Sequence, residues 1–196
     1  NSSLAAIHHL SLNGRRTDIT QRLSEGEVGG LLDVRDNVIP EQMAKLDTLA
    51  FNFVNEVNAI HNAGFGLDGV GGRDLFDAIA VQAGAAANVR VNQDLIDDPL
   101  RVAAATDVAA LPGDNRNLLE MTDLQDDAFV ALGDVTFSHF FAETIRAVGE
   151  AGRSNGYRLE VHEARLEQSE TLKSSITGVS VDDEMVDLTR FQKHFE

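Results

Sequence analysis

The feature that most restricts the fold is a run of apolar residues spaced at alternating steps of about four and three between positions 39 and 60. These residues are Ile39, Met43, Leu46, Ala50, Phe53, Val57 and Ile60, here called the first seam. Such a heptad pattern lines one face of an α-helix with apolar side chains, and that face needs another helix to cover it. Pro40 suits the first helical turn. The pattern predicts a helix over about residues 39–62 that packs against a long helical partner.

A second seam with the same spacing follows Thr136, the expected N-terminus of a long helix. Its members are Phe141, Ile145, Val148, Gly152, Asn155, Leu159, His162, Leu166 and Ser169. The small and polar members weaken a two-stranded coil and fix its register. We therefore predict a helix over about residues 136–174. The expected fold class is mainly α: an elongated antiparallel helical bundle or coiled coil with a small β component.

Weaker patterns predict the remaining elements. Alternating apolar residues on either side of Asn13-Gly14 predict a short hairpin within residues 1–30. Residues 87–91 and 101–105 are short strand candidates around a turn at 94–99. Asp114 is the expected cap of a short helix over about residues 114–124.

The C-terminal segment has the pattern of an amphipathic helix over about residues 180–196. Ser180 is a suitable N-cap, and acidic residues follow it at the positive end of the helix. The apolar stripe is still unfinished at Phe195. We expect this helix to continue in a longer chain, with a partner-binding helix in the missing tail.

The charge balance excludes several classes of partner. The chain has 32 acidic and 16 basic residues, a formal net charge of −16, and no cysteine. Nucleic acid and anionic membranes would repel such a chain. The absence of cysteine excludes disulfides and thiolate metal sites.

The segment from Gly64 to Gly72 contains a G-x-G-x-x-G pattern, which cradles a pyrophosphate when it follows a strand and opens a helix. Here it follows the end of a predicted helix. We interpret it as a helix C-cap and connecting loop in which glycines supply positive φ angles. A nucleotide-binding domain that uses this loop is the alternative.

No residue pattern indicates catalysis. The six histidines lack metal-ligand spacing, since the position four residues after His162 is Leu166. His61 is expected to act as a cation at a helix C-terminus. No nucleophile motif is present. We predict no catalytic residue, no metal site and no cofactor, so the chain is not expected to be an enzyme.

Two series of residues resemble a known family, the flagellar axial proteins of rod, hook and hook-associated type. The first is the turn and helix that contain Gly178, Ser180, Asp182 and the Phe191-Gln192 pair. The second narrows the resemblance to the hook-associated proteins; among its members are Gly29, Gly30, Arg35, Asp36, Pro40, Asp47, Asn58, His61 and Gly64. The resemblance implies that these residues have structural roles.

The resemblance also implies a function. It implies a non-catalytic subunit of the bacterial flagellum that joins hook to filament by helical packing, is exported through the flagellar secretion channel and lies outside the cell. The implied partners are further copies of itself, the hook protein and the adjacent hook-associated or filament proteins, with an export chaperone on the missing tail. Another axial protein such as flagellin is the alternative. Nucleic acid and membrane are not expected partners.

Two further expectations follow from the resemblance. Residues 1–17 would be the remnant of a preceding β-rich domain, and residues 18–196 the helical core. The expected assembly contacts, packed against the protein's own helices and neighbouring subunits, are Met185, Leu188, Phe191, Gln192 and Phe195.

Overall fold

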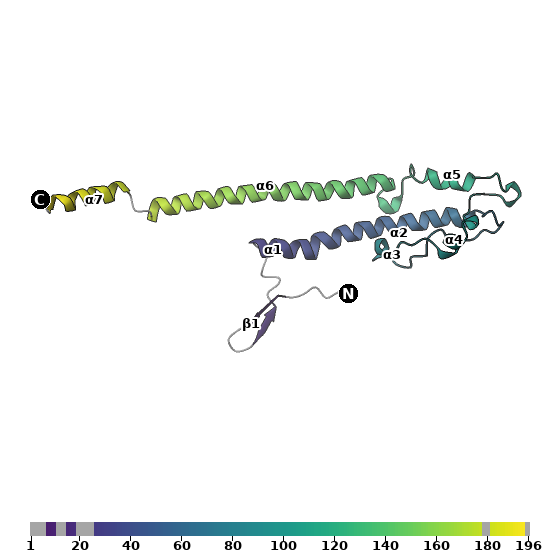
Figure 1. Ribbon diagram of the computed structural model, residues 1–196, viewed down its shortest axis with the longest axis horizontal. Helices are drawn as coiled ribbons and strands as arrows, with labels where there is room; N and C mark the ends of the chain where they lie inside the picture. Colours follow the sequence, from purple (N-terminus) through teal and green to yellow (C-terminus); the bar gives the residue numbers. More distant parts are fainter. Residues whose placement is uncertain (1–6, 11–14, 19–25, 178–180, 195–196) are drawn as a thin grey trace. The chain divides into compact units, whose positions relative to one another are not determined.

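The computed structural model describes residues 7–10, 15–18, 26–177 and 181–194 of the chain. These residues fall into two compact units, Asn1–Ile145 and Arg146–Glu196, each of which is described by itself (Figure 1). Helices account for most of the described residues, so the predicted mainly helical class is confirmed. Within the described ranges, no helix combines the length and the apolar content needed to cross a membrane.

The first unit begins with the predicted hairpin. Strands β1 (His8–Leu10) and β2 (Arg16–Asp18) pair in antiparallel fashion, with His9 opposite Thr17. The turn at Asn13-Gly14 lies outside the described residues. The β component before residue 30 is therefore confirmed.

A continuous helical segment runs from Gly26 to Ala63, and Figure 1 draws it as one ribbon. It consists of α1 (Gly26–Asp33), a π-helical turn η2 (Val34–Val38) and α2 (Ile39–Ala63). The helix predicted over residues 39–62 is confirmed as α2. The segment begins before residue 39, and the sequence pattern did not show this. The π turn accommodates one extra residue, which breaks the four-three spacing before Ile39 while the helix continues.

After Gly64 the chain folds back along α2 in a series of short helices, several of which contact α2. These are α3 (Ala85–Asn88), α4 (Gln93–Asp97), η3 (Pro99–Arg101), η4 (Val108–Ala110), α5 (Arg116–Asp123) and η5 (Val130–Leu132). The helix predicted over residues 114–124 is confirmed as α5. The expected cap at Asp114 is wrong by one position: Asn115 is the N-cap of α5 and makes no side-chain capping bond. Asp114 lies one residue earlier, and its Oδ1 accepts the Arg116 backbone N–H at 3.1 Å.

The two strands predicted at residues 87–91 and 101–105 are wrong. Val91 and Ala105 each make only an isolated bridge, to Phe76 and Phe65 respectively. Polar side chains turn the chain into short helices on either side: Asn92 accepts the Asp94 N–H at 3.0 Å and begins α4. Asp98 accepts the Leu100 N–H at 3.1 Å and begins η3. Local capping thus competes successfully with strand pairing.

The core of the first unit lies along the C-terminal half of α2. Its buried apolar residues are Val54, Val57, Ala85, Leu95, Ala103, Ala105, Leu124 and Leu132. Phe53 joins this core to the start of α6, since its ring lies 5.9 Å from that of Phe76 and 5.5 Å from that of Phe137. The first seam is covered only in this half. Ile39, Met43 and Leu46 are 50%, 58% and 39% exposed, so the antiparallel bundle stays a prediction.

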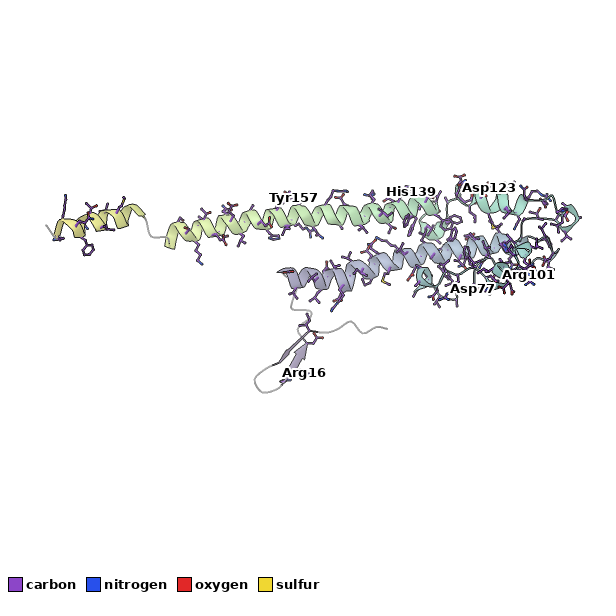
Figure 2. All side chains as sticks on the ribbon, viewed as in Figure 1. Arg16, Asp77, Arg101, Asp123, His139 and Tyr157 are labelled. Atoms are coloured by element: carbon purple, nitrogen blue, oxygen red, sulfur yellow. The ribbon has the colours of Figure 1, made fainter. Side chains whose placement is uncertain are left out.

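Helix α6 (Phe137–Thr177) confirms the long helix predicted over residues 136–174, and it runs from the first unit into the second. The Thr136 hydroxyl accepts the His139 N–H at 3.2 Å, which places the N-cap at the expected residue. In the second unit the side chains of α6 project into solvent; Tyr157, labelled in Figure 2, is 69% exposed. Helix α7 (Val181–His194) confirms the predicted C-terminal helix.

Gly64 offers a direct test of the packing beside α2. A Cβ atom at Gly64 would lie 2.2 Å from Nδ2 of the buried Asn117 and 3.0 Å from the Ala105 carbonyl oxygen. We expect Gly64→Ala to lower the free energy of unfolding by roughly 1–3 kcal/mol, as is usual for overpacking. Gly30 is the matched control, because a Cβ there meets nothing within 4 Å. In chemical denaturation, Gly30→Ala should stabilise the protein by about 0.5–1 kcal/mol. Equal effects of the two variants would contradict this packing.

Candidate functional site

A set of polar side chains holds the irregular segment 64–112 against α2, and we call it the polar clasp. Its members are Asp47, Asn58, His61 and Asn62 on α2, together with Asn117 on α5. The four residues of α2 lie at spacings of eleven, three and one, which places them on neighbouring positions of one helix face. The segment itself has few ladder hydrogen bonds, so its backbone groups need partners from elsewhere.

His61 is the centre of the clasp and is 0% exposed. Its Nε2 accepts the Ala103 backbone N–H at 3.0 Å. A backbone N–H can only donate, so the proton must be on Nδ1, which donates to the Arg73 carbonyl at 2.7 Å. One imidazole ring therefore joins two loop segments to α2. The expected role of His61 as a cation at the helix end is wrong, because Nε2 accepts a backbone N–H and therefore carries no proton.

Asn58 and Asp47 bind the same segment through its backbone. The Asn58 amide donates to the Phe76 carbonyl at 2.9 Å and accepts the Phe76 N–H at 2.8 Å, as a paired strand would do. The Asp47 carboxylate accepts the N–H groups of Gly84 at 2.7 Å and Ala86 at 3.0 Å. It therefore caps the N-terminus of α3 from a different helix, where negative charge is favourable.

Asn117 closes the clasp from α5. It is 1% exposed, its side chain donates to the Ala103 carbonyl at 2.8 Å, and its backbone N–H donates to the Ala104 carbonyl at 3.1 Å. Residue Ala103 thus has its N–H bound by His61 and its carbonyl bound by Asn117. The absence of a side chain at Gly64 is what makes room for the Asn117 amide.

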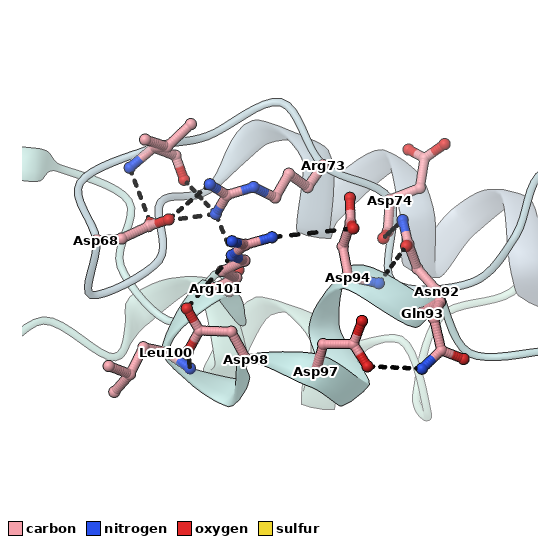
Figure 3. A network of polar contacts seen from close by, with 11 residues as sticks. Asp68, Arg73, Asp74, Asn92, Gln93, Asp94, Asp97, Asp98, Leu100 and Arg101 are labelled. Atoms are coloured by element: carbon pink, nitrogen blue, oxygen red, sulfur yellow. Dashed lines mark hydrogen bonds and ion pairs between the residues drawn. The ribbon is translucent and has the colours of Figure 1, made fainter.

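Two arginines add charged contacts at the far end of the segment (Figure 3). Arg73 forms a two-pronged pair with Asp68, at 2.6 Å and 3.1 Å, and reaches the Arg101 carbonyl at 3.5 Å. Arg101 in turn lies 3.3 Å from Asp98 and 3.9 Å from Asp94. The charge of Arg73 is therefore matched within its own loop by Asp68. That of Arg101, the last residue of η3, is matched by Asp94 in α4 and by Asp98, which precedes η3.

Three carboxylates are held in the charged form by neighbouring arginines. Hydrogen bonds from Arg116 above all lower the pKa of Asp114, which also accepts N–H and O–H bonds from Thr106. Arg73, then the Val70 N–H, lower the pKa of Asp68. Arg35 lowers the pKa of Asp36 in the π turn in the same way. Bound carboxylates of this kind stabilise the folded state only while they remain ionised.

The glycine-rich loop is a connecting loop, as interpreted from its position after a helix. Gly69 and Gly72 have φ angles of +74° and +75°. Its N–H groups are already used within the protein: those of Phe65, Gly66, Leu67, Gly69, Val70 and Gly72 donate to oxygens of nearby residues. The loop therefore has no row of free donors for a phosphate, which argues against the nucleotide-binding alternative.

The other residues selected from the sequence lie apart from the clasp. Gly29 is buried in α1, and Gly30 is exposed. Arg35 and Asp36 pair with each other in the π turn, with Nη2 to Oδ2 at 2.9 Å, and Pro40 lies in the first turn of α2. Gly178, Ser180 and Phe195, and the side chain of Asp182, lie outside the described residues.

The apolar stripe of α7 is exposed. Met185, Leu188 and Phe191 are 67%, 59% and 68% exposed, and Gln192 is exposed as well. The expected packing of this stripe against the chain's own helices is therefore not found in the second unit. An isolated helix of this length is marginal in water, so a partner elsewhere would be needed to hold it. Its role as an assembly contact stays a prediction.

Sequence reasoning missed Asn117, Arg73 and Arg101. A signal for Asn117 was present, because it lies four and seven residues before Met121 and Leu124, on the apolar face of the short helix. An amide in that position is either buried with partners or strongly unfavourable. The two arginines gave no such signal, since their partners are fixed only by the path of the loop.

Within the described ranges, no group of three or more His, Cys, Asp or Glu side chains is placed to hold a metal ion. The clasp residues bind backbone groups and one another, and no nucleophile is held beside a general base in it. The arrangement is suited to fixing the shape of a surface segment. These contacts define a structural arrangement in which the loops are fastened to one helix.

Comparison with known proteins shows what the chain is similar to. Residues 2–76 match the family described as "Flagellar hook-associated protein FlgK helical domain". That range includes Asp47, Asn58, His61, Asn62 and Gly64. Two curated relatives share the name "Flagellar hook-associated protein 1". The predicted resemblance to the hook-associated proteins is confirmed by these matches, at modest identity.

The relative from Bacillus subtilis (strain 168) is 24% identical over 160 residues, which cover 79% of this chain and 31% of that protein. The relative from Escherichia coli (strain K12) is 29% identical over 106 residues, which cover 54% of this chain and 19% of that protein. The matched part of the chain therefore spans less than a third of the length of either relative.

The central position of His61 leads to a stability prediction. We expect His61→Ala to lower the free energy of unfolding by roughly 2–5 kcal/mol, since it leaves the Ala103 N–H and the Arg73 carbonyl without partners and opens a cavity. The exposed His139 is the control: His139→Ala should change the free energy by less than about 0.5 kcal/mol. Urea denaturation measures both. A small effect at His61 would mean that it does not hold the loop.

The bound carboxylates lead to a prediction about pH. Their folded pKa values are depressed, so the unfolded chain takes up protons first as the pH falls. The contribution of these carboxylates to the free energy of unfolding should be constant above about pH 5. It should fall as the pH drops through about 4 and below. Asp68→Asn and Asp114→Asn should each make this decline shallower. The exposed Asp127→Asn should not, and an unchanged decline in all three variants would contradict the assignment.

Proposed function

We propose that this chain is part of a structural, non-catalytic subunit of the bacterial flagellum that joins hook to filament by helical packing between subunits. The observation that supports this most is the alignment with two proteins named flagellar hook-associated protein 1, over up to 79% of the chain. The family match over residues 2–76 supports the same assignment.

The contacts of the matched residues agree with a structural role. Asp47, Asn58, His61 and Gly64 were selected from the sequence because they resemble the family pattern, and all four fasten or accommodate the segment after α2. Their polar atoms bind backbone groups or make room for a buried amide. A subunit of a polymer needs a surface of fixed shape, and such contacts provide it.

The organisation of the longer protein belongs to the same proposal. Residues 1–17 would be the remnant of a β-rich domain, and residues 18–196 the helical core, in which α2 and α6 pair as an antiparallel coiled coil. The exposed apolar residues of the first seam, Ile39, Met43 and Leu46, favour such a covering helix.

The proposed partners follow from the position at the junction. They are further copies of the same protein, the hook protein and the adjacent hook-associated or filament protein, together with an export chaperone. The protein would pass through the flagellar secretion channel and lie outside the cell. Flagellin is the alternative axial protein, but both relatives are named as hook-associated proteins.

The stripe of α7 provides the test. Phe191 is 68% exposed in the second unit, so Phe191→Ala should cost little in folding. In the full-length protein we expect it to block incorporation at the hook tip, because a docked Phe contributes roughly 3–5 kcal/mol. Cells should then assemble hooks, lose filaments and release filament subunits into the medium.

Swimming assays, electron microscopy and immunoblots of the medium measure this outcome. Lys193→Ala, at an exposed position two residues further along α7, is the control and should leave motility unchanged. Normal filaments on hooks that carry Phe191→Ala would show that α7 is not an assembly contact.

A further inference from the structure

A π-helical turn joins α1 to α2, and the proposed function does not explain it. In η2 (Val34–Val38) the Ile39 N–H donates to the Val34 carbonyl, five residues back. An α-helix would make this bond to the residue four back. A π turn of this kind accommodates one inserted residue inside an otherwise regular helix.

The inserted residue changes which side chains share a face. Leu31 and Val34 lie eight and five residues before Ile39, which does not fit the heptad spacing of the first seam. When the one extra residue of the π turn is subtracted, the effective separations become seven and four. Those are heptad separations, and they place Leu31 and Val34 on the same face as Ile39 and the residues that follow it.

The exposure of these side chains agrees with one continuous face. Leu31, Val34, Ile39, Met43 and Leu46 are 64%, 41%, 50%, 58% and 39% exposed. The neighbouring Leu32 is half-buried, and Gly29 is buried. A regular helix would instead bring Leu32 and Arg35 toward the face of Leu46 and would turn Val34 away from it.

Polar contacts hold the turn on its other sides. Arg35 binds the carboxylate of the adjacent Asp36 through two nitrogens, at 2.5 Å and 2.9 Å. The Asn37 amide donates to Asp33 at 2.7 Å.

We infer that the π turn is a register device: it aligns Leu31 and Val34 with Ile39, Met43 and Leu46 as one apolar face about four turns long. This inference concerns the geometry of the helix and stands independently of the proposed function. It extends the first seam by two residues that the spacing in the sequence excludes.

Spin labels test the alignment in the full-length chain without changing its length. The described sequence contains no cysteine, so introduced thiols can be labelled selectively. We compare the pairs Leu31→Cys with Leu46→Cys and Leu32→Cys with Leu46→Cys by pulsed electron paramagnetic resonance. With the π turn, the 31–46 pair should give the shorter distance by about 2–3 Å, although it is one residue further apart. The opposite order is expected of a regular helix, about 1.5 Å of rise per residue, and would overturn the inference.

Deletions provide a second test. Removing Asn37 should convert the π turn into regular α-helix and keep Leu31 on the face of Leu46, with helical circular dichroism unchanged. Removing Glu41 from the regular part of α2 should rotate Leu31 by about 100° and lengthen the 31–46 distance. The pair Gln42→Cys with Asn55→Cys, inside α2, should be unchanged when Asn37 is removed. If the deletion of Asn37 lengthens the 31–46 distance as the deletion of Glu41 does, the turn does not set the register.

Discussion

The two hydrogen bonds of the buried His61 ring are the contacts on which the rest of the first unit depends. Segment 64–112 forms only short helices and isolated bridges, so it cannot satisfy its own backbone groups as a sheet or long helix would. His61 binds Ala103 on one side and Arg73 on the other, and it brings both to α2. Asn58, Asp47 and Asn117 act in the same way. Their side chains bind backbone groups of the segment that in a sheet would bind a neighbouring strand.

This construction explains how an acidic chain with few aromatic residues holds a long irregular segment. The apolar core beside α2 is small and consists largely of alanine, valine and leucine. Buried polar bonds are directional, so they select one path for the loop where a small apolar core alone would permit several. The same argument accounts for Gly64, whose missing side chain leaves the space for Asn117. A fixed loop path gives a surface of constant shape, which a subunit of an assembly requires.

The apolar faces of the helices differ from the clasp in being uncovered. The N-terminal half of the first seam and the stripe of α7 are exposed within their own units. Clasp residues therefore govern the fold of the single chain, whereas the exposed faces are the surfaces on which the proposed packing between helices and subunits would act. The π turn determines which side chains before Ile39 belong to the exposed apolar face of the helical segment.

The sequence by itself determined the long helices, the hairpin, the capping of α6 and the connecting role of the glycine loop, because periodicity and caps are local signals. It also marked Asp47, Asn58 and His61 as structural through their resemblance to a family. Their contacts were decided only by the tertiary structure, since each partner lies 12 to 42 residues away in the chain. The predictions of strands at 87–91 and 101–105 were wrong because they used only local sequence patterns. Capping by the remote Asp47 and by the nearby Asn92 begins short helices in this part of the chain instead. The start of the helix at Gly26 was likewise hidden, because one inserted residue shifts the period while leaving the helix continuous.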